Sequence, residues 1–455
     1  MKKFNFILAI LLLISGSIFY YNNYYFNADK IIKNSILKDK TFNAKVKEVT
    51  SSDGKVKAYH IEDNTIPLVA INFSFDKSGK AYEPKDGVVL FTKSLILDGA
   101  GKYNKKELRK IMKEKGIKIG ISSDNDSINF SVSYVKEFED IAKEIIKSVL
   151  FAPLIPNQEI EVLKQQVKML KKKQKEQPQY ELSSLIRDEF YTNHPYSKAP
   201  YPTNKQIDSI TDKDIKNYMN KYFTKDMLTI GSAGNINTKD LSLFLDDVFS
   251  ELKDNRTSNN LPKFNPIYNN ETKIKNANYS KQTFSTHIRP GIKRQDKDFY
   301  PFYIANYIFG GSGLNSRLNK SIREKDGLTY GIYSYMTEND SGCYWNISYS
   351  ATDKNATKIE KLLENEINNF YQNGITKEEL ELAKNSLISS FNLRFASLFE
   401  IALQLNMIKK QNLGQDFLEK RQDIIKNITL SDVNKVIKNR FSPNKRVFIL
   451  KAKEN

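Results

Sequence analysis

The sequence predicts an α+β protein that consists of two homologous domains in tandem, each an antiparallel sheet covered by helices. Three observations lead to this prediction. The chain has 455 residues, more than one ordinary hydrophobic core accommodates. A pattern of helices and strands in its first half recurs in its second half. Within the halves, stretches with the two-residue period of a strand accompany stretches with the period of an amphipathic helix.

The clearest repeat joins IDSITDKDIKNYMNKYFTKDM, residues 207–227, to IIKNITLSDVNKVIKNRFSPNKR, residues 424–446. At a constant offset, Ile207, Ile210, Thr211, Asp214 and Phe223 fall opposite Ile425, Ile428, Thr429, Asp432 and Phe441. A threonine followed three residues later by a carboxylate is typical of a capped helix start. Each half should therefore contain a capped helix that leads to a short last strand, TIGSAG in the first half and RVFILKA in the second.

A second match aligns FAPLIPNQEIEVLKQQ with FYQNGITKEELELAKN and predicts that Asn157 and Thr376 are helix N-caps. Earlier in the chain, Asn104 should cap a helix that Gly116 ends. Residues 128–134 alternate apolar and polar side chains, which indicates a strand. We expect each sheet to carry its helices mainly on one face.

These repeats predict a first domain in residues 40–253, a polar linker in residues 254–270 and a second domain in residues 271–455, with no single continuous core across the linker. Residues 1–28 contain the charged and apolar regions of an export signal. Their apolar run approaches the shortest length that spans a membrane, so a cleaved signal and a retained anchor remain alternatives. We therefore expect export to the periplasm or cell envelope, with inner-membrane attachment if the leader is retained.

The formal charge of +18 would permit binding to nucleic acid or to anionic lipid. The basic residues are mostly scattered lysines, without a basic stripe or an aromatic-basic repeat, and they indicate solvated surface rather than a nucleic-acid interface. The single cysteine, Cys343, excludes an intrachain disulfide framework and a cysteine-based zinc cluster.

The most specific motif is GGSGLNSRLNKSIREKDGLTYGIYS, residues 310–334. A glycine-rich turn, with no Gly-Lys-Ser or Gly-Lys-Thr after it, precedes Ser-Arg-Leu and then Arg323 and Tyr330, seven residues apart. Together with HPYSKAP, residues 194–200, and the tandem repeats behind an export signal, this motif resembles the insulinase or pitrilysin family of zinc peptidases, the inverzincins. The resemblance spans nearly the whole chain after the leader and implies domains that form a half-shell around a peptide chamber.

Catalytic members of that family carry H-x-x-E-H on a first-half helix, where two histidines bind zinc and the glutamate acts on the bound water. In this chain, Leu90, Lys93 and Ser94 occupy the three motif positions, and Gln166 falls near the position of the family's third ligand. None of these side chains can replace an imidazole or a carboxylate base. The resemblance therefore implies no metal in this chain, with zinc only in a partner subunit.

The three histidines are far apart in sequence and have no zinc-ligand spacing. We expect His60 to lie at the surface of a strand, His194 to shape a loop beside Pro195, and His287 to end a strand.

For Arg323 and Tyr330, physical chemistry alone suggests a cation at a helix C-terminus and an aromatic residue that opens a strand. The resemblance instead implies that both donate hydrogen bonds to the substrate carbonyl at a zinc site. It also implies that Gly310, Gly311 and Gly313 border the peptide cavity, where small residues let a peptide backbone approach.

The leading hypothesis is a non-catalytic subunit of a heteromeric zinc metallopeptidase. It would pair with a zinc-bearing homologous subunit and act on peptides or unfolded polypeptides. The alternatives are a catalytically inactive peptide-binding protein that holds an extended chain at a sheet edge, or a structural component of a cell-envelope assembly.

Overall fold

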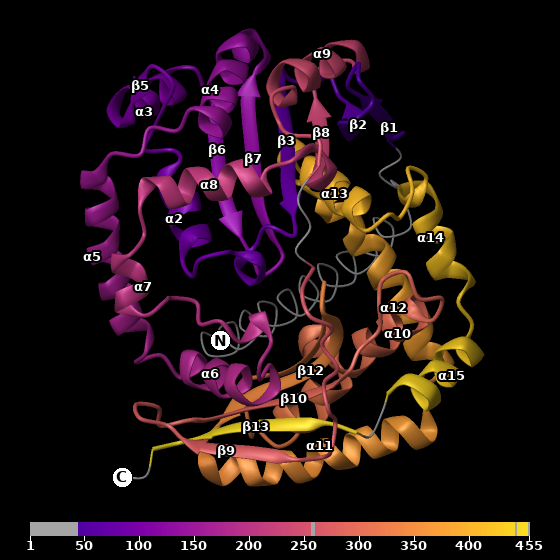
Figure 1. Ribbon diagram of the computed structural model, residues 1–455. Helices are drawn as coiled ribbons and strands as arrows, with labels where there is room; N and C mark the ends of the chain where they lie inside the picture. The colour runs from indigo at the N-terminus through magenta and orange to yellow at the C-terminus, as the bar shows by residue number, and fades with distance from the viewer. Residues whose placement is uncertain (1–43, 256–259, 442–443, 454–455) are drawn as a thin grey trace, which may run out of the picture.

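The computed structural model describes residues 44–255, 260–441 and 444–453, and it places them in two sheets with helices around each (Figure 1). The expected leader, residues 1–28, lies outside the described residues. No helix formed by the described residues combines the length and apolarity needed to cross a membrane.

The first sheet has six strands in the order β1-β2-β8-β3-β7-β6. They are β1 Lys47–Thr50, β2 Lys57–Glu62, β3 Leu68–Asp76, β6 Lys118–Ser123, β7 Ser127–Val135 and β8 Leu228–Gly234. Two further short strands, β4 Gly99–Ala100 and β5 Tyr103–Asn104, pair with each other. Strand β7 contains the predicted alternating stretch, and its side chains alternate between buried and half-buried.

The second sheet has the order β11-β12-β10-β13-β9. Its strands are β9 Thr272–Asn276, β10 Thr283–Pro290, β11 Ile332–Asn339, β12 Gly342–Ala351 and β13 Arg446–Lys451. When the first sheet is taken from its opposite edge, its order is β6-β7-β3-β8-β2-β1. Its first five strands then correspond one by one to β11-β12-β10-β13-β9, which confirms the internal repeat. The sheets are not purely antiparallel, because β2 pairs with β8, and β9 with β13, in parallel. A long stretch of helices and other strands separates the members of each parallel pair in the chain, so no hairpin constrains their direction.

Helices lie between and after the strands in both halves. The first half contains α2 Val88–Leu95, α3 Lys105–Glu114, α4 Glu139–Phe151, α5 Asn157–Gln174, α6 Pro178–Phe190, α7 Asn204–Asp208, α8 Asp212–Tyr222 and α9 Thr238–Phe249. The second half contains α10 Phe299–Asn306, α11 Asp353–Asn373, α12 Lys377–Ser389, α13 Leu398–Lys410, α14 Phe417–Asn427 and α15 Leu430–Arg440.

Four of the five predicted helix N-caps are confirmed. Thr211, Thr376 and Thr429 each cap a helix through a complete capping box, as does Asn104. The prediction for Asn157 is wrong: Pro156 holds the extended N-cap conformation, and Asn157 is the first residue of α5. The repeat aligns the two helices, but the proline moves the start of α5 by one residue.

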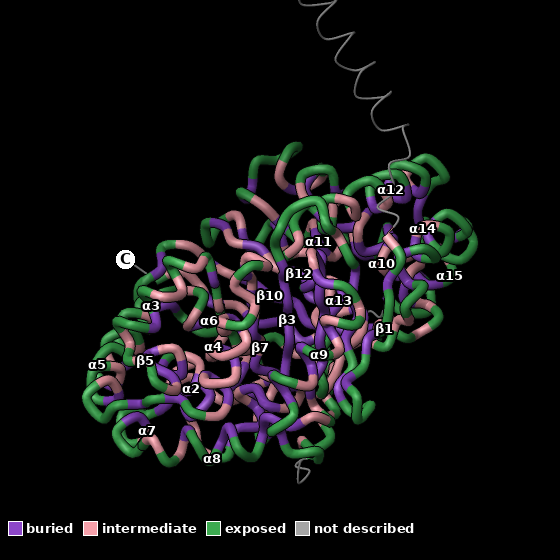
Figure 2. The backbone as a smooth tube through the Cα atoms, turned by 90° about the horizontal axis from the view of Figure 1, so that it is seen from above, coloured by how far each residue is buried: buried purple, intermediate pink, exposed green. Residues whose placement is uncertain are grey.

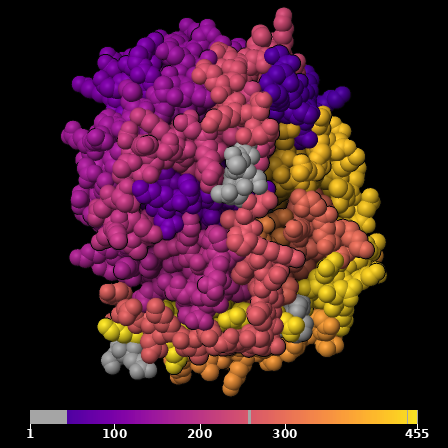
Figure 3. Space-filling view, viewed as in Figure 1, coloured from indigo at the N-terminus to yellow at the C-terminus, as the bar shows by residue number. Residues whose placement is uncertain are grey.

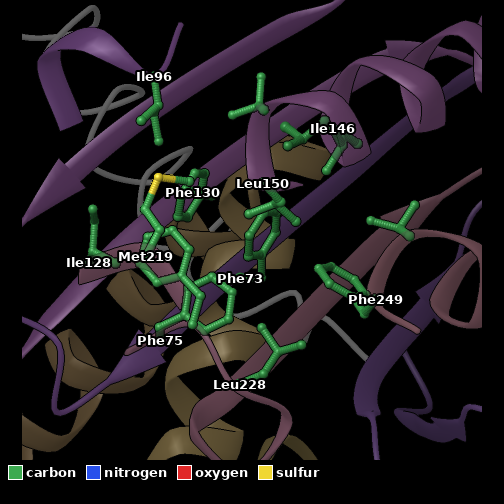
Figure 4. Close-up of a cluster of buried hydrophobic side chains, with 14 of the residues drawn as sticks. Phe73, Phe75, Ile96, Ile128, Phe130, Ile146, Leu150, Met219, Leu228 and Phe249 are labelled. Atoms are coloured by element: carbon green, nitrogen blue, oxygen red, sulfur yellow. The ribbon is translucent and has the colours of Figure 1, made fainter. Parts of the chain in front are cut away.

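Each half has its own main core. In the first, Phe73 and Phe75 of β3 and Phe130 of β7 meet Leu150 of α4 and Met219 of α8 (Figure 4). In the second, Trp345 is buried among apolar residues of α10, α11 and α15. Figure 2 shows the strands as buried segments with exposed turns of helix around them. These two main cores remain separate in the described residues.

The two halves nevertheless exchange a helix. Helix α13 of the second half packs on β8, β3 and β2 of the first sheet, where Leu405 and Ala402 join Ile61 and Ala70 in a shared cluster (Figure 1). The backbone approaches so closely that a Cβ atom at Gly231 would lie 2.1 Å from the carbonyl oxygen of Ala402.

Helix α6 of the first half makes the reciprocal contact with β13, β10 and β9. Its Phe190 packs on Ile288, Tyr344 and Phe448. Each half therefore keeps its own helices mainly on one face of its sheet, as expected, and the second face is covered by a helix from the other half. In Figure 3 the yellow C-terminal segments lie beside the indigo N-terminal residues on the surface.

The residues described between 254 and 270 form no helix or strand. They are nevertheless attached to the first half, since Phe264 and Tyr268 pack against α6. The Nε2–H group of His194 donates a hydrogen bond of 3.0 Å to the carbonyl oxygen of Pro262.

Candidate functional site

The segment that carries the Gly-rich motif is irregular helix. Residues Tyr307–Gly311 and Asn319–Glu324 form π-helical turns, and the second of them stands where the sequence suggested the end of an ordinary helix. Such wide turns are rare and occur frequently at functional sites. Between them, Gly313 has a φ of +63°, a conformation that disfavours other residues.

The three glycines differ in their surroundings. Gly310 is buried, and a Cβ atom there would lie 2.7 Å from the backbone nitrogen of Ser334 in β11. The absence of a side chain on Gly310 makes room for β11 of the protein itself. The expected contact of Gly310 with a peptide is therefore corrected. Gly311 is exposed and Gly313 is half-buried, with no atom within 4 Å of the position that a Cβ atom would take on Gly313. Only these two remain accessible to a ligand.

Asn319 holds this segment together, although the sequence analysis did not identify it. Its buried Nδ2 group donates to the carbonyl oxygens of Gly313, at 3.0 Å, and Ile332, at 2.6 Å. It thereby joins the glycine turn to the start of β11. The sequence signal for Asn319 was a polar residue on the buried face of a helix, because a buried amide group needs hydrogen-bond partners.

Arg317, the arginine of Ser-Arg-Leu, fixes the segment to the next layer. Its Nε and Nη2 groups each donate a 2.6 Å hydrogen bond to Glu379. Glu379 also completes the capping box of α12. Arg317 is therefore an anchor for the segment rather than a group presented to solvent.

Arg323 and Tyr330 are brought together by the turn between them. The Nε group of Arg323 donates a 3.0 Å hydrogen bond to the carbonyl oxygen of Tyr330. The Tyr330 side chain is 86% exposed. Strand β11 begins at Ile332, so Tyr330 lies before the strand and packs no sheet face, which corrects the simpler expectation. Among the described residues, the phenol and the terminal guanidinium nitrogens have no hydrogen-bond partner.

The degenerate zinc motif lies in the first half, beside a cavity of about 680 Å³. Helix α2 contributes Leu90 and Lys93 to its wall. Ser94 is exposed, does not line the cavity, and donates its hydroxyl to the carbonyl oxygen of Leu90 at 2.8 Å. The helix predicted for these positions is present.

The position inferred for the third ligand requires a correction. Gln166 is exposed on α5 and does not line the cavity, whereas Lys171 and Lys175 of the same helical segment do. A shift of five residues moves a position about 7.5 Å along a helix. The sequence match placed α5 correctly but could not tell which of its turns faces α2.

The residues around this cavity do not fit a zinc ion. The lining includes no imidazole or thiolate, and the α2 position of the catalytic glutamate carries the ammonium group of Lys93. In residues 44–255, 260–441 and 444–453, no group of three or more His, Cys, Asp and Glu side chains is arranged to hold a metal.

The histidines lie in separate parts of the fold. His60 is fully buried in β2, with its ring nitrogens 3.2 Å from Ser232 Oγ and 2.8 Å from the carbonyl oxygen of Ile236, so the expected surface position is wrong. His194 shapes its loop as expected, by accepting a bond from the backbone of Tyr196. His287 lies inside β10 rather than at its end, beside Glu360.

Burial shifts the charges of the cavity wall. Desolvation raises the pKa of Glu83 to about 7. Burial, together with the positive charges of Arg187 and Lys198, lowers the pKa of Lys80 to about 8. Burial also lowers the pKa of Lys93. At neutral pH the wall therefore carries incompletely neutralised positive charge.

Rebuilding the motif alone should not create a zinc site. The triple variant Leu90→His, Lys93→Glu and Ser94→His restores H-x-x-E-H, but the facing helix still presents Lys171, whose ammonium group repels a cation. We expect no stoichiometric zinc by metal analysis after dialysis. A further Lys171→Glu change should increase zinc retention, whereas a further Gln166→Glu change should not. Tight zinc binding by the triple variant itself would contradict this assignment.

Two family models match the chain. Residues 58–203 match the insulinase model of peptidase family M16, and residues 209–387 match the model described as the peptidase M16 inactive domain.

A relative from Helicobacter pylori, named non-peptidase homolog YmxG, is 22% identical over 85% of this chain and 89% of its own. The crystal structure of a peptidase M16 inactive domain from Pseudomonas fluorescens has a TM-score of 0.80 at 22% identity, covering 90% of this chain and 98% of that one. The periplasmic protease PqqL from Escherichia coli has a TM-score of 0.76 at 13% identity, covering 91% of this chain but 46% of its own.

Proposed function

Because the chain belongs to the insulinase family, peptidase family M16, and carries an inactive-type second half, we propose that it is the non-catalytic subunit of a two-chain zinc peptidase. In this proposal it pairs with a separate homologue that holds the zinc ion. It supplies Arg323 and Tyr330 to the active site of that homologue. The zinc ion there would provide Lewis acidity and an activated water.

The state of Arg323 and Tyr330 carries the proposal. The side chain of Tyr330 is 86% exposed, and the guanidinium of Arg323 is held by a single bond from Nε. The terminal nitrogens of Arg323 and the phenol O–H have no partner within the described chain, so they are available as donors. Donors presented in this way suit an oxyanion that develops on a substrate carbonyl.

The first half supports a division of labour between two chains. Its motif positions hold Leu90, Lys93 and Ser94, which provide neither zinc ligands nor a base. The E. coli protease supports pairing, because the match occupies 46% of that chain and leaves room for a second unit of similar size.

The proposed substrate is a peptide or an unfolded segment. Strand β6 is an edge of its sheet, and so is β11, which follows Tyr330. Edge strands present unpaired backbone groups that can bind an extended chain. Gly313 borders this region and leaves space beside its backbone, and the exposed Gly311 lies close to it in sequence. In this proposal the leader exports the protein to the periplasm or cell envelope.

The same edges favour a second candidate, a peptide-binding or structural protein of the cell envelope without catalysis. In that case a peptide adds to β6 or β11 by backbone hydrogen bonds, and Tyr330 contributes only contact area.

Co-expression with a homologue that bears H-x-x-E-H distinguishes the two candidates. We expect the two full chains to elute together on size-exclusion chromatography, and peptidase activity to require both chains. Full activity of the homologue by itself, unchanged by addition of this chain, would refute the proposal and favour the second candidate.

A further inference from the structure

The first-half cavity holds positive charge in the place where zinc-bearing members hold their metal. We propose that it is a binding site for a carboxylate carried by a peptide, either an acidic side chain or a C-terminus. This inference deepens the proposed function in one respect, since it takes the ligand to be a peptide. It needs neither the partner subunit nor its zinc ion.

Lysine dominates the charged residues of the wall. Five lysines and three carboxylates line the cavity: Lys80, Lys93, Lys171, Lys175, Lys198, Glu83, Asp86 and Asp124. Lys198 neutralises part of the negative charge of the wall. Its Nζ lies 2.9 Å from Asp86 and 3.9 Å from Glu83. Asp124 accepts bonds of 2.7 Å from the backbone nitrogens of Asp126 and Ser127, so its carboxylate is used within its own turn.

The other four lysines form no ion pair with any described residue. Lys80 donates to the carbonyl oxygen of Lys198 at 2.9 Å, and Lys171 to that of Pro202 at 2.6 Å. Lys93 and Lys175 have no hydrogen-bond or ion-pair partner within the described chain. The amines of Lys80, Lys93 and Lys171 are partly withdrawn from water, which lowers the pKa of each.

Grouped ammonium ions in a partly desolvated cavity repel one another, and burial weakens the hydration that would otherwise compensate. An anion between them removes this repulsion and satisfies the donors. A metal cation would increase it. With Lys93 at the position of the catalytic base and Lys171 on the facing helix, this cavity therefore prefers an anion to a metal cation.

The position of the cavity indicates a peptide as the carrier of the anion. Strand β6 ends at Ser123, and Ser123, Asp124 and Asn125 form part of the wall. A peptide that pairs with the free edge of β6 as an additional strand would direct a side chain or its C-terminus into the cavity. Tyr180 and Tyr201 provide apolar surface at the wall for the remainder of that residue.

Titration calorimetry on the full chain tests the proposal with defined probes. Three hexapeptides share one neutral sequence: one carries a glutamate and an amidated end, one a free C-terminus, and one neither. Inorganic phosphate is the fourth probe. We expect at least one of the two charged peptides to bind, and the neutral peptide to bind at least about tenfold more weakly. Which charged peptide binds more tightly identifies the source of the carboxylate.

Lysine variants locate the site. Lys93→Gln and Lys171→Gln should each weaken binding of the charged peptide about three- to tenfold, because each removes one charge-assisted contact. Lys172→Gln is the matched control, since Lys172 is exposed on the same helix as Lys171 and does not line the cavity; its affinity should not change. Thermal melts of all three variants confirm folding.

Three outcomes would overturn the proposal. They are equal binding of the neutral and charged peptides, an affinity insensitive to Lys93→Gln and Lys171→Gln, and binding of phosphate without binding of either charged peptide. None of them bears on pairing with a zinc-bearing homologue, so this proposal and the proposed function can fail separately.

Discussion

In a complex with a zinc-bearing homologue, Tyr330→Phe should lower the turnover number about ten- to a thousandfold. The substitution removes one O–H donor and retains the ring. Because Tyr330 is 86% exposed and packs against no core, the folded chain should lose little stability. The loss should fall mainly on kcat, since a hydrogen bond to an oxyanion strengthens as charge develops in the transition state.

Arg323→Ala should have an effect of similar size, and Arg323→Lys separates its two roles. Lysine retains the charge but lacks the planar fork, and it cannot reproduce the Nε bond to the carbonyl oxygen of Tyr330. If orientation of the pair matters, Arg323→Lys should recover only part of the activity. Steady-state kinetics and thermal melts of the same complexes provide the two measurements.

Tyr333→Phe and Tyr335→Phe are matched controls. Both residues are exposed tyrosines of β11, at 45% and 46%, close in sequence to Tyr330. Removal of the hydroxyl group of either residue should leave the turnover number of the complex unchanged. Unchanged turnover in Tyr330→Phe and Arg323→Ala would leave Arg323 as a half-buried cation near the end of its helix and Tyr330 without a catalytic role.

Gly231→Ala should destabilise the protein by about 3 kcal/mol or more, which is large for the addition of one methyl group. The new Cβ atom would lie 2.1 Å from the carbonyl oxygen of Ala402 and 2.3 Å from the backbone nitrogen of Asn406. Both are backbone atoms of α13, so no side-chain rotation relieves the clash. The whole helix must move away from the sheet.

Moving α13 disrupts one of the two helix contacts that attach the halves to each other. The buried Asn406 donates bonds of 3.3 Å to the carbonyl oxygen of Asn72 and 2.7 Å to that of Thr229. Leu405 and Ile408 would also lose their contacts with the first-half strands. The buried amide of Asn406 would lose both bonds, and an unsatisfied buried donor costs about 1–3 kcal/mol, which adds to the lost apolar contacts.

Chemical denaturation measures this effect, with Gly54→Ala as the control. Gly54 has a φ of +70°, and no atom lies within 4 Å of the position that its new Cβ atom would take. Its substitution therefore carries only the cost of a left-handed alanine, about 1 kcal/mol. A loss for Gly231→Ala no larger than that for Gly54→Ala would show that α13 adjusts to the sheet more easily than its backbone contacts indicate.

Local chemistry explains which features of this chain could be predicted from its sequence. The capping boxes of Thr211 and Thr429 are formed by residues three positions apart, so the hydrogen bonds that start these helices are visible in the sequence. The alternation in β7 likewise reflects neighbouring residues that face opposite sides of a sheet. The substitution of Leu90, Lys93 and Ser94 at the zinc motif also required only a linear comparison.

The repeated order of helices and strands, the absence of a zinc motif and the proximity of Arg323 to Tyr330 could be predicted, because these depend on short spacings along the chain. Three features could not be predicted: α6 and α13 exchange sheets, His60 is buried, and Lys171 rather than Gln166 faces α2. Each of these depends on contacts between residues far apart in the chain. A helical or strand period shows which side chains share a face, but only packing decides what that face meets.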